Sequence, residues 1–129
     1  MAEGRRWMEQ IIELLGDQYV VYEHNNYSRQ ARLLNHQGLV ALFDGNLDLA
    51  RENFLGGFDL CKQPDLAYEA ALASSNVALL EATSGSPTRC IGWAYEALTV
   101  QHALGDLHGQ ATSLLHRGIG KFYNCDIDD

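Results

Sequence analysis

The side chains best suited to chemistry in this chain are its histidines, which are His24, His36, His102, His108 and His116. A helical zinc site needs two histidines four residues apart, usually as H-E-x-x-H, and no pair here has that spacing. His108 and His116 are eight residues apart, so on one helix face they lie about 12 Å apart, too far to share a metal without a third element. We therefore expect the histidines at the surface or at helix caps.

The cysteines are the second group of reactive side chains. Cys61, Cys90 and Cys125 form an odd, widely spaced set without a C-x-x-C pair, so neither zinc nor thioredoxin-like chemistry is indicated. Such a set fits free thiols in a reducing cytosol better than a disulfide framework. We expect Cys61 and Cys90 to fill small core positions and Cys125 to lie in a turn. A Cys–His catalytic pair stays open, because such partners need not be neighbours in sequence.

Glycine pairs and a terminal acidic run complete the candidate motifs. Gly56-Gly57 and Gly118-x-Gly120 lack the strand and Gly-rich turn of a phosphate loop, and we interpret them as close-packing positions. The acidic tail from 126 to 129 resembles a calcium loop only superficially, since it lacks the glycine and the closing glutamate. No nucleophile, acid–base pair or metal cluster has motif spacing, so we expect no enzyme activity, no cofactor and no metal.

Composition limits the class of protein. The 129 residues suit one domain or one segment of a longer chain, and 47% hydrophobic against 20% charged residues favours a packed core over disorder. The formal charge of −8 disfavours binding to nucleic acid or anionic membranes and would suit a basic partner. The Arg5-Arg6-Trp7 cluster is too small to reverse that. The chain has no apolar run near 18 residues and its start lacks a signal-peptide core, so we expect a cytoplasmic protein.

Apolar periodicity predicts helices along the whole chain. A first helix covers 5–15 and stops at Gly16-Asp17, and a second covers roughly 18–24. The polar stretch 24–28 is either a turn, with Ser28 as the N-cap of the next helix, or the middle of one long helix. Further helices are expected over 29–43, 47–61, 66–82, 89–104 and 107–123.

Turn residues separate the later helices. Asp44-Gly45-Asn46 is a turn triplet in which glycine supplies a positive φ, and Leu104-Gly105-Asp106 ends the helix before it. Pro64 cannot lie inside a helix, and 83–88 is the clearest loop, with Ser86 or Thr88 as a cap and Pro87 in the first helical turn.

The spacing between Leu34 and Pro64 resembles a tetratricopeptide repeat, a helix–turn–helix unit of about 34 residues. The matching positions are Leu34, Gly38, Gly45, Ala50, Phe54, Gly57 and Pro64, with Gln37 and Ala41 departing from the family pattern. Small residues at Gly38, Ala50 and Gly57 would let helices approach closely, and Phe54 would fill the space between them.

Two weaker repeats follow the first, which spans about 31–64. In the second, about 68–104, Ser75 takes the place of Gly38, and Cys90, Ala94 and Ala97 match Ala50, Phe54 and Gly57. The third is a half repeat over 111–129, with Leu114 large and Gly118 small, and its Asn124–Asp129 end aligns with the turn at Gly45. The L-G-D helix endings resemble the longer-helix type found in signalling scaffolds and bacterial regulators.

The resemblance implies an all-α fold, an α-α superhelix of antiparallel helix pairs with six or seven helices in a right-handed solenoid. A half repeat leaves one apolar face uncovered. We therefore expect either a fragment of a longer solenoid or an open end filled by another chain, with homo-oligomerisation through the terminal helix as one form. The alternative is that the last helix itself serves as a cap.

In this family the first helix of each repeat lines a concave groove that binds a peptide or helix of a partner protein. By resemblance the groove residues are Arg32, Asn35, Leu39, Leu42, Glu69, Leu72, Asn76, Leu79, Thr112, Leu115, Ile119 and Phe122. They suit an amphipathic helix or extended peptide with apolar anchors, with Arg32, Asn35 and Asn76 setting its orientation. The groove lacks the lysines with which chaperone-tail binders of this family clamp a terminal carboxylate.

The expected function is a noncatalytic protein–protein interaction module. The alternatives are a ligand- or peptide-sensing domain of a larger signalling or transcription regulator, and a self-associating scaffold.

Overall fold

The computed structural model describes residues 6–10 and 23–124. In these residues the chain is all-helical, and the predicted fold class is confirmed. The helices are α2 (Glu23–Phe43), α3 (Leu47–Leu60), a short 3-10 helix η1 (Pro64–Leu66), α4 (Ala67–Ser84), α5 (Pro87–Leu104) and α6 (Leu107–Tyr123), and residues 6–10 are helical as well. The expected helix over 18–24 falls almost wholly outside the described residues, as do the turn at Cys125 and the acidic tail.

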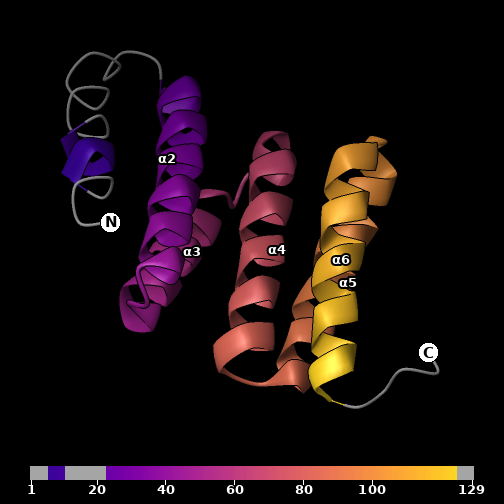
Figure 1. Ribbon diagram of the computed structural model, residues 1–129. Helices are drawn as coiled ribbons and strands as arrows, with labels where there is room; N and C mark the ends of the chain where they lie inside the picture. The colour runs from indigo at the N-terminus through magenta and orange to yellow at the C-terminus, as the bar shows by residue number, and fades with distance from the viewer. Residues whose placement is uncertain (1–5, 11–22, 125–129) are drawn as a thin grey trace.

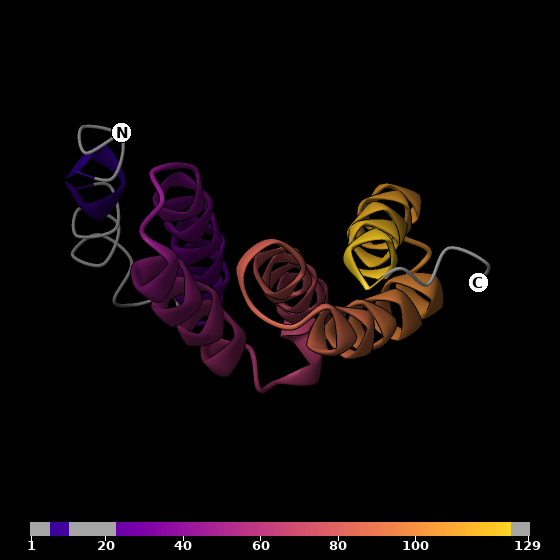
Figure 2. The same ribbon diagram turned by 60° about the horizontal axis from the view of Figure 1, so that its bottom comes forward.

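The helices form a stack of antiparallel pairs (Figure 1). The second helix of each pair packs on the first, α3 on α2 and α5 on α4, while α4 also contacts α3, α2 and α6. The end-on view shows α2, α4 and α6 arranged in an arc with α4 at its base, and α3 and α5 on the outer side (Figure 2). The stack is therefore curved, with a concave side lined by α2, α4 and α6.

Local sequence signals set most of the helix boundaries. Gly45 and Gly105 adopt the left-handed conformation, with φ of 81° and 70°, at the ends of α2 and α5. The side chains of Asn46, Ser86 and Asp106 cap the next helices by accepting hydrogen bonds from backbone N–H groups three residues ahead.

Of the two alternatives left open for 24–28, the helical one agrees with the structure, whereas the predicted helix end at Ala82 is wrong. The stretch 24–28 lies inside α2, so Ser28 is not an N-cap; its hydroxyl donates instead to Glu69 of α4 at 3.0 Å. The loop at 83–88 is shorter than expected, because Thr83 and Ser84 continue α4 and their hydroxyls bond to carbonyls one turn earlier.

The core consists of small residues with Phe54 at its centre. Phe54, fully buried on α3, packs with Ala41, Ala50, Val77 and Leu80. A Cβ added at Gly38 would overlap the Phe54 ring, and one at Gly57 would lie 3.3 Å from the Ala31 carbonyl. The expected role of these two glycines in close packing is confirmed.

The second and third repeats depart from the expected register. Ser75 faces α6, where its hydroxyl lies 3.0 Å from His116, and so does not hold the place that Gly38 holds against α3. Gly118 is exposed, with no atom within 4 Å of an added Cβ, and Gly56 has only one, at 3.9 Å. The close-packing glycine of α6 is Gly120, which lies against Cys90 and the Pro87 carbonyl.

The second core cluster joins α4 to α5. Cys90, Ala94, Ala78 and Ala82 form it, with Trp93 and Ile119 packed against it. Cys61 lies in a third cluster, with Ala31 and Leu66. Both cysteines are free and buried, as expected, and burial raises the pKa of each thiol to about 11.

Candidate functional site

A pocket of about 220 Å³ opens on the concave side, where α2, α4 and α6 converge. Three half-buried leucines give it an apolar lining: Leu39 from α2, and Leu72 and Leu79 from α4. Leu72 and Leu79 are seven residues apart, two helical turns, and therefore share one face of α4. Residues far apart in sequence thus supply one apolar surface.

Polar side chains surround this apolar lining. Tyr68 and His108 are exposed, and Asp106 and Thr112 are half-buried. The Asp106 carboxylate accepts the Gly109 N–H at 2.9 Å and so fixes the first turn of α6 at the pocket. The pocket therefore combines an apolar interior with hydrogen-bonding groups at its exposed side.

A buried polar network forms the wall behind the pocket. His116 Nδ1 lies 2.8 Å from the Ser75 carbonyl, which only accepts, so Nδ1 carries the proton. Ser113 donates to the Ser75 hydroxyl at 3.0 Å. The amide nitrogen of Gln101 faces Ser113 and donates to the Ser113 hydroxyl at 2.8 Å and to the Gly109 carbonyl at 3.0 Å. The network ties α4, α5 and α6 together.

The burial of His116 corrects the expectation of surface or capping histidines. Only 6% of His116 is exposed, and burial lowers its pKa, partly offset by the hydrogen bond to the Ser75 carbonyl. Its imidazole is therefore neutral at pH 7. A serine and a histidine are in contact here, and Ser75 is 1% exposed, with its hydroxyl bonded within the network.

A second set of polar contacts joins α2 to α4. Asn35 is fully buried; its oxygen accepts from Asn76 at 3.1 Å, and its nitrogen donates to the Ala31 carbonyl. Glu69, 5% exposed, accepts from Arg32 at 3.2 Å. Asn35 and Glu69 were expected to face a partner, but their side chains hold the two helices together.

The twelve predicted groove residues fall into four places. Leu39, Leu72, Asn76, Leu79 and Thr112 line the concave pocket. Arg32, Asn35 and Glu69 form the α2–α4 contact, with the exposed Arg32 guanidinium 5.8 Å from the ring of Tyr68. Leu42 packs half-buried on the first core cluster. Leu115, Ile119 and Phe122 line a separate hollow on the open face of α6.

Sequence reasoning missed seven residues of the pocket lining, namely Tyr68, Ser75, Gln101, Asp106, His108, Gly109 and His116. A signal existed for Tyr68, which is one turn before Leu72 on the same face of α4. Asp106 and His108 lie at the N-terminus of α6, so they could be predicted as pocket residues once that end of the helix is known to lie at the groove. Gln101 comes from α5, whose arrival at the pocket has no signal in the sequence.

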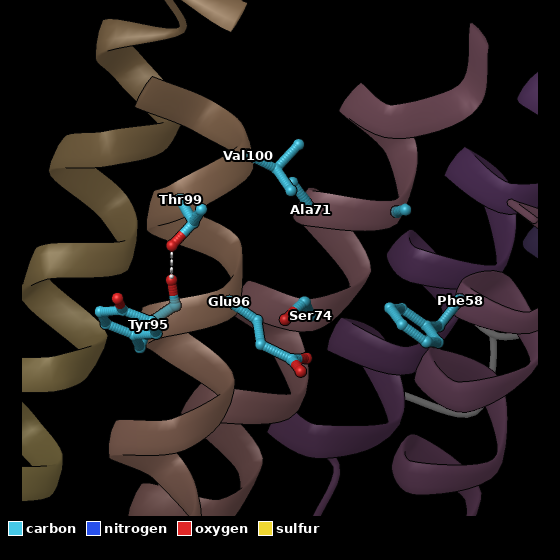
Figure 3. Close-up of a pocket in the computed structure, with 8 residues that line it drawn as sticks. Phe58, Ala71, Ser74, Tyr95, Glu96, Thr99 and Val100 are labelled. Carbon is cyan, nitrogen blue, oxygen red and sulfur yellow. Dashed lines mark hydrogen bonds between the residues drawn. The ribbon is translucent and has the colours of Figure 1, made fainter. Parts of the chain in front are cut away.

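A larger pocket of about 440 Å³ lies on the outer side, between α3, α4 and α5. Figure 3 shows Phe58 on one side and Tyr95, Glu96, Thr99 and Val100 on the other, with Ala71 and Ser74 of α4 between them. Its lining is mostly apolar, and Glu96 is its charged member.

Among the described residues, no three or more His, Cys, Asp or Glu side chains form a group that could hold a metal ion. In the same part of the chain, no helix has the length and apolar character needed to cross a membrane. Comparison with protein-family models, with curated proteins and with solved structures finds no match to this chain.

Proposed function

We propose that this protein is a noncatalytic interaction module of the tetratricopeptide type, which binds a peptide segment of a partner protein on its concave side. The observation that carries the proposal is the convergence of Leu39, Leu72 and Leu79 from two helices on one pocket with polar groups around it. An apolar interior that excludes water, with a polar rim, is the usual anatomy of a binding hot spot.

The size of the concave pocket favours a peptide over a free small molecule. Its volume of about 220 Å³ lies below the ~300–1,000 Å³ of most small-molecule sites. One apolar side chain of a longer ligand fits such a space, and the rest of the ligand would lie along α2, α4 and α6. Tyr68, Thr112 and His108 offer hydrogen bonds to the backbone on either side of that anchor.

Charge narrows the chemistry of the partner. The chain carries a net charge of −8, and Asp106 places a carboxylate at the pocket. Long-range attraction therefore favours a segment with basic residues beside its apolar anchor. Arg32, at the border near Tyr68, is the counterpart for an acidic residue at one end of the segment.

A random peptide library displayed on phage, selected against the immobilised protein, tests the proposal. We expect selected peptides to share an apolar anchor with nearby Lys or Arg and to lose at least tenfold in affinity toward Leu79→Arg, which puts a charge into the pocket. The matched control is Leu47→Arg, at an exposed leucine on the outer helix α3. Thr112→Trp, which fills the pocket without altering the core, should weaken binding in the same way. Equal affinity for all variants would overturn the proposal.

The outer pocket favours a second function, ligand sensing within a larger regulator. Its volume of about 440 Å³ falls inside the small-molecule range. Apolar walls with one carboxylate, Glu96, suit a compact apolar molecule that carries a positive group. Screening a fragment library by NMR would reveal it through shifts at Phe58 and Val100, and the absence of any such fragment would remove this alternative.

We also assign the protein to the cytosol and to interaction-based signalling. The buried, free thiols of Cys61 and Cys90 support the first assignment, since a reducing compartment keeps cysteines in that state.

A further inference from the structure

The helix α6 carries a second apolar face opposite its packed one. Its buried residues are Ser113, His116 and Gly120, which face α4 and α5. On the other side of the helix lies a stripe of six exposed nonpolar residues: Leu107, Ala111, Leu114, Leu115, Gly118 and Phe122. A turn of 100° per residue places these six within an arc of about 100° along the full length of α6. We call this set the α6 stripe.

The spacing of the α6 stripe is the same in both directions. The intervals between its successive residues are 4, 3, 1, 3 and 4, symmetric about the point between Leu114 and Leu115. Residue sizes follow the same symmetry, because Leu107 corresponds to Phe122 and small Ala111 corresponds to small Gly118. A two-fold axis through that midpoint would place large opposite large and small opposite small on two antiparallel helices.

Among the described residues, none packs closely against Gly118. A Cβ built there meets no atom within 4 Å, although glycine inside a helix is destabilising relative to alanine. A hollow of about 580 Å³ lies around it, lined also by Leu114, Leu115 and Phe122. Glycine opposite alanine would let two helix backbones approach closely, which explains its presence.

The exposed area suits an interface between two chains. Leu107, Leu114, Leu115 and Phe122 are 79%, 45%, 62% and 68% exposed, and the adjacent Tyr123 is 58% exposed. Large side chains present about 150–250 Å² each, so these five expose on the order of 500 Å², approaching the ~800 Å² per partner of a standard interface. The α6 stripe carries no charge, and α6 has no acidic residue, so this helix adds no carboxylate repulsion between two copies of a chain of net charge −8.

We propose that the α6 stripe docks onto the α6 stripe of a second copy of this chain, in an antiparallel two-fold arrangement. Leu114 and Leu115 of both copies meet at the axis. Ala111 lies opposite Gly118 of the other copy, and Leu107 lies opposite Phe122 of the other copy. The concave pocket is not part of this interface, so the proposal goes beyond the binding function and stands or fails separately.

Sedimentation equilibrium of the full chain between about 1 µM and 1 mM tests self-association, because a Kd in that range is within reach of an interface of this size. We expect a dimer whose Kd rises at least tenfold in Ala111→Glu/Gly118→Glu, which opposes like charges across the axis. Ala111→Glu/Gly118→Lys loses the same small residues but pairs opposite charges instead, so its Kd should rise clearly less. The two variants differ at one position, and circular dichroism verifies that both stay folded. Tyr95→Glu, an equally exposed aromatic residue on α5, is the control that leaves the dimer intact.

Cross-linking tests the register directly, in chains that also carry Cys125→Ser. A mixture of Ala111→Cys and Gly118→Cys chains should form a disulfide-linked pair, because opposed positions on tightly packed helices come within the ~7 Å limit on Cα separation. Either variant alone should not, because its two copies are displaced by seven residues, about 10 Å along the helix.

A monomer at every concentration, or a dimer unaffected by Ala111→Glu/Gly118→Glu, would overturn the proposal. So would cross-linking of each single variant with itself, which would indicate another register. Binding of the stripe to lipid vesicles or to a different chain, with no dimer, would count against it in the same way.

Discussion

The close contact between Gly38 and Phe54 allows a sensitive test of how α2 packs against α3. A Cβ added at Gly38 overlaps the edge of the Phe54 ring, which is fully buried and surrounded by Ala41, Ala50 and Val77. Gly38→Ala therefore forces either a displaced ring or a wider separation of α2 and α3.

The magnitude follows from two opposing terms. Overpacking a well-filled core costs about 1–3 kcal/mol, and the overlap here indicates the upper end. Replacing a helical glycine by alanine returns about 1 kcal/mol through helix propensity. The net expectation for Gly38→Ala is a loss of about 2 kcal/mol, which would lower the Tm by roughly 8 °C in a domain of this size.

Gly92→Ala is the matched control, because it makes the same chemical change in an exposed helical position with no atom near the new Cβ. It should gain up to about 1 kcal/mol. Urea denaturation of both variants measures the difference, and Phe54→Leu added to Gly38→Ala should recover part of the loss, as coupled neighbours do. Equal stability changes for Gly38→Ala and Gly92→Ala would refute the reasoning.

Three further predictions concern buried groups. Arg51 pairs with Glu81, which is 2% exposed, so Arg51→Met leaves a buried carboxylate unpaired and should lower the free energy of unfolding, measured in urea, by about 3 kcal/mol. The double variant Arg51→Met/Glu81→Gln should recover part of that loss. A loss under ~0.5 kcal/mol for Arg51→Met would instead be typical of an ordinary surface ion pair. Burial lowers the pKa of His116, so below its usual 6.5 the unfolded chain binds the extra proton. Stability should then fall with decreasing pH from about 6.5, and His116→Gln should flatten that part of the profile; an unchanged profile would contradict the burial. Burial raises the thiol pKa values of Cys61 and Cys90 to about 11. In a chain carrying Cys125→Ser, both thiols should therefore react with iodoacetamide at pH 8 no faster than the protein unfolds locally or globally. Rapid labelling of the folded protein would contradict this.

The sequence predicted the features that depend on neighbouring residues. The cap at Ser86, the positive φ at Gly45 and the helix end at Leu104-Gly105-Asp106 are local, since each cap or turn is completed within a few residues. Helix boundaries and the all-α class follow from them.

The sequence could not predict contacts made between distant helices. Ser28 lies within α2, and its hydroxyl donates to Glu69, 41 residues away in sequence. Asn35 lies on the same face of α2 as Leu39, which does line the pocket, but its side chain is buried against Asn76 of α4, 41 residues away. Of the two glycines expected to pack closely on α6, Gly120 does and Gly118 does not, and the burial of His116 likewise depends on contacts with α4 that the sequence does not show.

The most direct test of the central claim is the site at which a selected peptide binds. Titration of the peptide into protein with labelled leucine methyl groups reports each position separately. We expect shifts at Leu39, Leu72 and Leu79 on the concave side, and none at Leu47 on the outer side. Shifts confined to Leu114 and Leu115 of α6, or found only at Leu47, would contradict it.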